Sequence, residues 1–265
     1  MNDLSLAISQ VRYTNKAFWR NSLSAFFTFV FPLMFLVIFT VLFGNDETCI
    51  GAVVGDRCTG QVVSLSTFYV ASISAFSIIT ACYTNIAISI TFARDAGVLK
   101  RIRGTPIPTW TYLAGRIAHG VFVAVLLVAI CTAFGAMFYE AEVPTSTLPA
   151  FLLTLAVGAA SFCALGLAIS GPIPNADSAP AIVNASILPL LFISDVFIRL
   201  EDPPTWLEIT SKLFPVKHFV DGMLASFFPV PGESSLRLGD LAIVALWGLA
   251  GVVVAARLFR WEPHR

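Results

Sequence analysis

Residues 23–44 read LSAFFTFVFPLMFLVIFTVLFG and contain no charged side chain. As an α-helix rising roughly 1.5 Å per residue, this stretch is long enough to cross about 30 Å of hydrocarbon. Backbone groups inside lipid must be hydrogen-bonded within the segment, which favours a helix. The stretch also lacks the alternation of polar and apolar residues that is typical of membrane barrels. It therefore predicts a transmembrane helix.

Five further apolar stretches follow along the chain, at residues 65–91, 111–138, 150–170, 181–199 and 238–259. The composition agrees with a membrane protein, because 57% of the 265 residues are hydrophobic and only 12% are charged. Soluble domains carry about 25% charged residues. The sequence therefore predicts an all-α polytopic protein in which residues 1–265 form a single transmembrane domain with six transmembrane helices.

The basic residues predict how the chain is oriented in the cell membrane. An even number of spans places both termini on the same side. If that side is the cytoplasm, eleven of the 16 Lys and Arg residues lie inside and five lie outside. We therefore expect a multi-pass plasma-membrane protein with both termini in the cytoplasm. The net charge is zero, so the composition gives no indication of a nucleic-acid partner.

Two segments outside the spans are predicted to form helices at the membrane surface. Residues 1–22 place apolar side chains on one helical face and Arg12, Lys16 and Arg20 on the neighbouring face, as an amphipathic interfacial helix does. A general positively charged anchor on the cytoplasmic side is the alternative. Residues 201–228 are too polar for a span, are rich in aromatic residues and are divided by Pro215. They predict a re-entrant helical hairpin on the extracellular side, before the last span.

Residues 92–108 form the most charged of the predicted cytoplasmic stretches. Pro106 and Pro108 end any helix there. The apolar residues before them share one face of a short helix, and basic residues cover the other face. A basic loop that only fixes the membrane topology is the alternative. The residues singled out in this segment are Arg94, Asp95, Gly97, Val98, Leu99, Lys100, Arg101, Ile102 and Arg103.

Polar residues within the spans are candidates for lining a translocation pathway. The hydroxyl residues of the second span form a narrow stripe, which either lines a pathway or forms a close helix–helix seam. Asp195 lies within a predicted span, where it either faces a pathway, pairs with Arg199 four residues later or sits near the outer interface. The candidate pathway residues are Ser77, Thr80, Thr84, Asn85, Asn184 and Asp195.

No nucleotide-binding or catalytic motif is found in the sequence. Gly55 and Gly60 have the glycine spacing of a phosphate-binding loop, but Gln61-Val62 stands where that loop requires Lys and Ser or Thr. The three histidines are far apart in the sequence, so no metal site is predicted. We therefore predict that the chain is not an enzyme and binds no cofactor, and that any ATP binds another chain.

The five cysteines divide into two groups. Cys49 and Cys58 lie in one predicted outer loop, where the environment is oxidising, so they are a candidate disulfide. Two free thiols are the alternative. Cys82, Cys131 and Cys163 lie within predicted spans, where cysteine acts as a small apolar residue.

Three groups of residues, in this order and spacing, resemble the membrane permeases of type-2 ATP-binding cassette (ABC) exporters, the family that includes the daunorubicin-resistance type. The first group is Arg94–Pro108, the second is LPLLFIS at residues 188–194, and the third is residues 204–224. The chain departs from the family pattern at Asp195, where the family usually has glycine.

This resemblance implies a fold and a mechanism. Two permeases, identical or related, pair around a central pathway, and separate ABC ATPase subunits that carry ATP and Mg²⁺ dock on the coupling segment 92–108. The resemblance further implies export of a hydrophobic or amphipathic substrate such as a drug, an antibiotic or a lipid. A small secondary transporter, or a membrane assembly protein without an ATPase partner, is the alternative.

Overall fold

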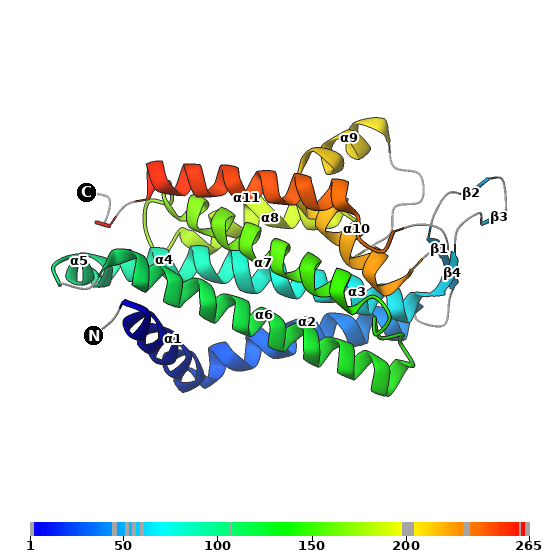
Figure 1. Cartoon of the computed structure of the whole chain (residues 1–265), viewed down its shortest axis with the longest axis horizontal. Coiled ribbons are helices and arrows are strands. Elements are labelled where there is room, and N and C mark those ends of the chain that lie inside the picture. The colour runs from blue at the N-terminus through cyan, green and yellow to red at the C-terminus, as the bar shows by residue number, and fades with distance from the viewer. Residues whose placement is uncertain are drawn as a thin grey trace.

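The computed structural model describes residues 3–43, 47–50, 53–54, 57–58, 61–105, 108–197, 204–229, 234–259 and 261–262. Within these ranges the chain is an elongated bundle of helices (Figure 1). The helices are α1 (Asp3–Arg20), α2 (Ser22–Phe43), α3 (Leu65–Ile79), the π-helical segment η1 (Thr80–Thr84), α4 (Asn85–Asp95), α5 (Val98–Arg103), α6 (Thr109–Tyr139), α7 (Leu148–Ser170), α8 (Ala179–Ile193), α9 (Thr205–Leu213), α10 (Pro215–Phe227) and α11 (Leu238–Leu258).

Five of the six predicted spans are confirmed as helices that are long and apolar enough to cross a membrane. They are α2, the continuous helix α3–η1–α4, α6, α7 and α11. The predicted span 181–199 differs, because α8 has only 15 residues and extends about 22 Å, less than the roughly 30 Å of a hydrocarbon core. It ends at Ile193, and the next residues form a buried turn in which Asp195 has a φ of 57°.

The loop between α2 and α3 contains short strands, which the sequence analysis did not anticipate. β1 (Glu47–Ile50) pairs antiparallel with β4 (Gln61–Ser64), and β2 (Val53–Val54) pairs with β3 (Arg57–Cys58). Valine, isoleucine and threonine are frequent in these strands, as expected of residues that favour extended backbone. The side chains of Cys49 and Cys58 lie outside the part of the chain that is described, so their disulfide stays a prediction.

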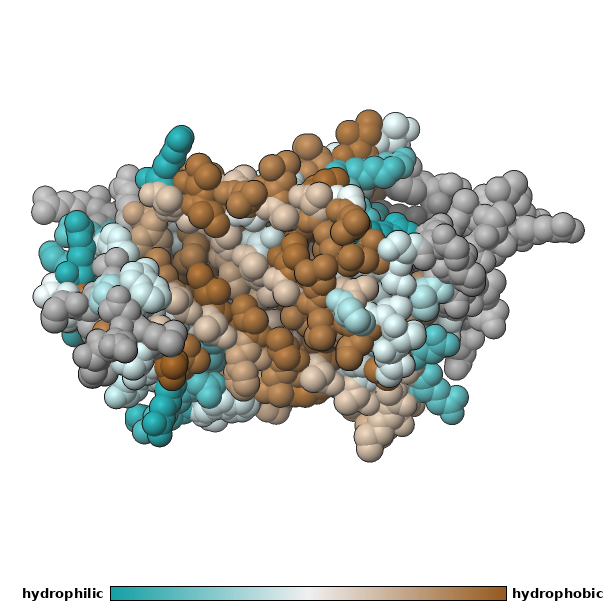
Figure 2. Space-filling model, in the orientation of Figure 1, coloured by the Kyte–Doolittle hydropathy of each residue, from teal (hydrophilic) through white to brown (hydrophobic). Residues whose placement is uncertain are grey.

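The continuous helix α3–η1–α4 lies at the centre of the bundle. Its apolar window is 89% buried inside the protein, against 17% for α2 and 22% for α11. Figure 2 shows a hydrophobic band across the middle of the molecule with hydrophilic residues towards both ends. Burial of the central helix and exposure of the outer helices in this band are what a bundle surrounded by lipid requires.

Glycine residues allow the backbones of neighbouring helices in the bundle to approach one another closely. A Cβ atom on Gly166 of α7 would lie 2.7 Å from the carbonyl oxygen of Tyr83 in η1. A Cβ atom on Gly248 of α11 would lie 2.9 Å from the Cα atom of Ser161 in α7. Close packing on glycine is a common way for helices to associate in membranes, where apolar contact alone gives no preference over lipid.

The two surface segments of the sequence analysis are helical. α1 packs against α6, where a Cβ atom on Gly115 would lie 2.7 Å from Cβ of Gln10. Residues 204–228 form two helices, α9 and α10, that meet at Phe214-Pro215. α10 is buried against α3, α7 and α11, whereas most of α9 is exposed. The beginning of α1 and the end of α11 lie at the same end of the bundle as α5, and α10 lies towards the opposite end (Figure 1).

Candidate coupling and translocation site

A buried arginine ties the end of α4 to the connection between α7 and α8. The side chain of Arg94 is only 1% exposed. Its Nη1 donates hydrogen bonds to the carbonyl oxygens of Ser170 at 2.8 Å and Gly171 at 3.4 Å, and its Nη2 donates to that of Ile173. Several parallel donors on a planar fork are specific to arginine. Arg94 therefore joins two connections that lie at the same end of the bundle.

The neighbouring carboxylate strengthens this link. Oδ2 of Asp95 accepts a hydrogen bond of 2.5 Å from the backbone N–H of Ala176. The chain then turns through Gly97, whose φ of 69° lies in the left-handed region that glycine adopts without strain. This turn starts the short helix α5 in a new direction. Arg94 and Asp95, the two charged residues that lead into α5, thus both bind the segment 170–176.

Part of the apolar face of α5 is buried inside the protein. Leu99 is fully buried in the core of this chain. Ile102 is half-buried and packs against the same core, whereas Val98 is 37% exposed. Of the residues that the sequence analysis singled out in this segment, four are exposed: Val98, Lys100, Arg101 and Arg103.

The hydroxyl stripe of the second predicted span divides between a seam and a cavity. Ser77 belongs to the seam, because its Oγ donates to the carbonyl oxygen of Ile73 at 2.7 Å and lies 3.9 Å from Sγ of Cys131 on α6. Thr80, Thr84 and Asn85 instead line a cavity of about 300 Å³ between the central helix and α2. The structure therefore brings three of the six pathway candidates together.

These three residues lie in or directly after the π-helical segment η1. The N–H of Asn85 bonds to the carbonyl of Thr80, five residues back, so this turn holds one residue more than an α-helical turn. Such single π turns within α-helices are often found at functional sites. The sequence analysis did not predict η1, since no pattern of side chains marks it.

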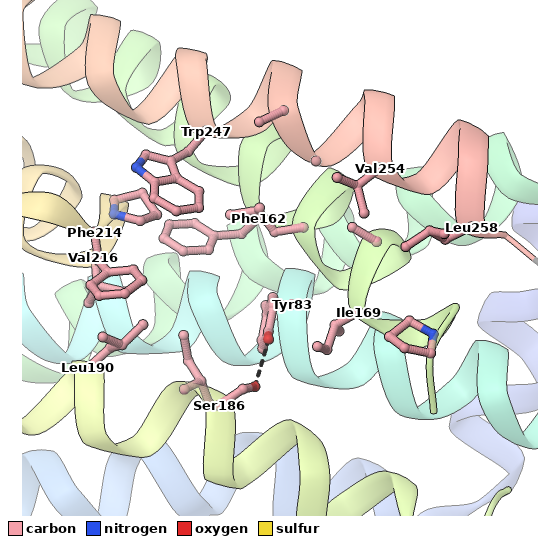
Figure 3. Close-up of a pocket in the computed structure, with 17 residues that line it drawn as sticks. Tyr83, Phe162, Ile169, Ser186, Leu190, Phe214, Val216, Trp247, Val254 and Leu258 are labelled. Carbon is pink, nitrogen blue, oxygen red and sulfur yellow. Dashed lines mark hydrogen bonds between the residues drawn. The ribbon is translucent and has the colours of Figure 1, made fainter. Parts of the chain in front are cut away.

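Tyr83, also in η1, lines a second cavity, of about 360 Å³, between α7, α8 and α11 (Figure 3). Its hydroxyl group lies 2.7 Å from Oγ of Ser186 on α8. Apart from this pair the lining is largely apolar and includes Phe162, Leu190 and Trp247. The sequence analysis missed Tyr83 and Ser186; a tyrosine between the candidates Thr80 and Thr84 was the available signal.

The remaining candidates lie elsewhere. Asn184 is on the exposed side of α8. Asp195 lies in the turn after α8, and its Oδ2 pairs at 2.5 Å with Nζ of Lys217 on α10. Lys217 also lies 3.2 Å from Oδ1 of Asp221. Arg199, the partner considered from the sequence, lies outside the range that the structure describes.

The φ of 57° at Asp195 lies in the left-handed region, which glycine adopts most easily. In this chain the carboxylate instead gains an ion pair with Lys217. Burial alone lowers the pKa of the Lys217 ammonium, but the carboxylates of Asp221 and Asp195 outweigh it, and the pKa lies above its ordinary value. Lys217 is therefore held as a cation that joins the end of α8 to α10.

A second polar contact joins α10 to α11. Nδ1 of His218 lies 2.6 Å from Oδ1 of Asp240, and Nε2 lies 2.8 Å from the carbonyl oxygen of Lys212. Together with the Asp195–Lys217–Asp221 group, this contact fixes α8, α9, α10 and α11 relative to one another at the end of the bundle opposite α5.

A double-mutant cycle tests the Asp195–Lys217 pair. We expect Asp195→Asn and Lys217→Met each to lower the free energy of unfolding. Because the two groups are in contact, the loss in the double variant should be about 1–2 kcal/mol smaller than the sum of the losses in the two single variants. The measurement is unfolding of the purified protein in detergent. Glu208 and Lys212, an exposed pair on α9, provide the control cycle, for which we expect a coupling near zero. Additive effects at Asp195 and Lys217 contradict the pairing.

The comparisons with known proteins agree with this architecture. The family model described as ABC-2 type transporter matches residues 8–228. The chain is 26% identical over 257 residues to the inner membrane transport permease YadH of Escherichia coli K12, covering 93% of each chain. It is 23% identical to the putative transport permease YvfS of Bacillus subtilis, over 77% of this chain and 78% of that protein. It is 26% identical to the probable multidrug ABC transporter permease YbhR of Escherichia coli K12, over 51% of this chain and 36% of that protein. A match over most of the chain, together with a bundle of apolar helices, shows that the protein belongs to the ABC-2 type transporter family of membrane permeases.

Proposed function

We propose that this permease exports a hydrophobic or amphipathic substrate across the cell membrane, using ATP that is hydrolysed with Mg²⁺ on separate ABC ATPase subunits. The observation that carries this proposal is the segment 94–103. Its first two residues and Leu99 are anchored inside the permease, while a basic surface that includes the side chain of Val98 faces outward. A helix of this kind transmits a displacement from a docked subunit to the bundle, because its buried residues are fixed to the other helices and move with them.

The hydrogen bonds of Arg94 and Asp95 connect such a displacement of α5 to further helices. Both side chains bind the connection between α7 and α8, so movement of α5 acts on α4, α7 and α8 together. η1 and α8 are also joined directly, by Tyr83 and Ser186, beside the 360 Å³ cavity. This arrangement favours a mechanism in which the ATPase subunit changes the cavities around η1.

The proposed placement in the membrane puts α5 and both termini in the cytoplasm. The excess of basic residues at that end supports it. In this placement α8 and the turn after it complete a sixth crossing, α1 lies at the inner membrane surface, and α9 and α10 form the outer hairpin. A second permease, identical or related, completes the transporter. Family membership argues against the alternative of a secondary transporter.

The lining of the cavities supports the proposed substrate class. The 360 Å³ cavity is lined mainly by apolar and aromatic side chains, which suits a hydrophobic or amphipathic molecule of drug size. Similarity to a protein named a probable multidrug ABC transporter permease supports the same class. We therefore include drugs, antibiotics and lipid-like molecules among the proposed substrates.

Substitution on α5 tests the proposed coupling. We expect Val98→Asp to weaken association with the ATPase subunit roughly 30-fold, because it places a carboxylate at the apolar centre of a basic docking surface. Transport should fall with it, while the permease reaches the membrane in normal amount. Association is measured by co-purification from membranes, and export in reconstituted vesicles.

Two controls make this experiment decisive. Val143→Asp changes an equally accessible valine, 45% exposed, in the connection between α6 and α7, and should leave association unchanged. Leu99→Ala should reduce stability rather than association alone, since Leu99 is buried in this chain. Wild-type association and transport in Val98→Asp would falsify the docking role of α5.

A further inference from the structure

A polar pocket of about 200 Å³ lies between α1, α4 and α6, apart from the coupling segment and from the cavity at Tyr83. Unlike that cavity, it is lined by hydroxyl, amide and basic groups. The polar side chains in its wall are Thr14, Asn21, Asn85, Ser89, Arg116 and His119. Its volume is several times the roughly 30 Å³ that one water molecule occupies in the liquid, so it is large enough for a phosphate ester.

The strongest indication of a ligand is His119. The side chain is only 6% exposed, and its Nδ1 has no hydrogen-bond partner among the residues that the structure describes. A buried polar atom of this kind usually has a partner, and a missing one indicates water or a ligand. Because the ring lines the pocket and packs edge-on against Phe18 at 5.2 Å, a molecule in the pocket is the natural partner.

The charge around the pocket favours an anion. Arg116 lines it and is held in place by a hydrogen bond of 3.1 Å from its Nε to the hydroxyl of Tyr112. The basic residues of α1, Arg12, Lys16 and Arg20, are exposed and do not line the pocket, so Arg116 is the basic group in its wall. No carboxylate lines the pocket. A phosphate group accepts hydrogen bonds from arginine, imidazole and amide donors alike.

The pocket adjoins the cavity between the central helix and α2. Ala81 and Asn85 belong to the walls of both. This cavity beside α2, of about 300 Å³, is mostly apolar and is bordered by Phe27, Phe31 and Pro32 of α2. α2 is itself largely exposed along its length. A polar compartment next to an apolar one that opens beside a lipid-facing helix matches a molecule with an anionic head and an alkyl chain.

We infer that this pair of cavities binds an anionic phospholipid from the membrane leaflet at the α5 end of the bundle. The phosphate lies near Arg116 and His119, and one acyl chain follows the cavity beside Thr80 and Thr84. Basic pockets between helices at the membrane surface are a common way to recognise anionic lipid headgroups. The inference goes beyond the proposed export, because it concerns binding to the permease alone.

Lipid binding to the purified full-length permease tests this inference by native mass spectrometry. The probes are phosphatidylglycerol and phosphatidylcholine with the same acyl chains, and glycerol 3-phosphate. We expect the wild type to bind phosphatidylglycerol about tenfold more tightly than phosphatidylcholine, because both lipids carry the phosphate but the trimethylammonium group of phosphatidylcholine is repelled by Arg116. Glycerol 3-phosphate should not compete, since it lacks the chain.

Variants locate the site. Arg116→Gln and His119→Gln should each weaken phosphatidylglycerol binding about tenfold, and Arg116→Lys should retain part of it. Thr84→Phe should weaken it by filling the apolar cavity. Arg103→Gln, which removes an exposed charge on α5, should change it less than twofold. Melting temperatures confirm that each variant is folded.

Three results overturn the inference: equal affinity for the two lipids, an effect of Arg103→Gln as large as that of Arg116→Gln, and displacement of the lipid by glycerol 3-phosphate. The last result identifies a soluble phosphate ester as the ligand. Because no ATPase subunit takes part, a negative result leaves the proposed export mechanism untouched, and failure of that mechanism leaves lipid binding standing.

Discussion

Replacing Arg94 with glutamine is expected to abolish coupled transport and to destabilise the permease by about 3 kcal/mol or more. The substitution removes a buried cation that donates to three carbonyl groups of the α7–α8 connection. Hydrogen bonds from a charged donor contribute roughly 1.5–3 kcal/mol each, so the loss is large even if the connection rearranges. Export in reconstituted vesicles and unfolding in detergent measure the two effects.

Two further variants separate the geometry of Arg94 from its charge. Arg94→Lys keeps the charge but has no planar fork, so it should recover only part of the stability. Arg103→Gln removes a charge from the exposed surface of the same segment and should change stability by less than about 0.5 kcal/mol. If Arg94→Gln is as stable as the wild type, the α7–α8 connection is held by other contacts and the proposed transmission from α5 loses its structural basis.

The second large effect is expected at Gly166. Gly166→Ala should destabilise the protein by about 3 kcal/mol, because the added methyl group meets two backbone oxygens, 2.7 Å away at Tyr83 and 3.0 Å away at Cys82. Backbone atoms cannot swing aside as a side chain does, so α7 must move away from η1. Unfolding in detergent measures the loss, and export measures whether the displaced η1 still supports transport.

Gly239 provides the matched control. It lies in the first turn of α11, and nothing lies within 4 Å of the position that its Cβ would occupy. Gly239→Ala should therefore be neutral, or stabilising by up to about 1 kcal/mol through the reduced entropy of the unfolded chain. Equal stabilities of the two alanine variants would show that α7 and η1 are not packed at backbone distance.

The spans were predictable because lipid imposes a single requirement, an apolar helix of sufficient length, that can be read from any window of the sequence. The same requirement explains the exception at 181–199. Hydropathy there continues through Leu191, Phe192 and Ile193, but the backbone leaves the helix at Ser194 and enters the left-handed region at Asp195. The hydropathy of a local stretch of sequence does not predict a turn that is stabilised by an ion pair with Lys217, 22 residues further on.

The candidate site was only partly predictable, for a similar reason. Arg94 looks like one of several basic residues of a cytoplasmic loop, and its role depends on carbonyl groups 76 to 79 residues away. Leu99 and Val98 are neighbours with the same polarity, yet one is buried and the other is exposed. The family resemblance correctly identified the protein class. Which residues are buried in the protein and which are exposed on its surface could be learned only from the packed structure.

The position of α3 at the centre of the bundle has a consequence for biosynthesis. The helix emerges early from the ribosome and carries many hydroxyl groups, among them Ser66, Ser72 and Ser74. It is covered by α6, α7 and α10, all of which are made later. At about 5–20 residues per second, the interval between the end of α3 and the appearance of α10 is on the order of ten seconds. During that time the polar surface of α3 is not yet covered by all the helices that pack on it. A product that stops before α10 should therefore be recognised by membrane quality control and degraded.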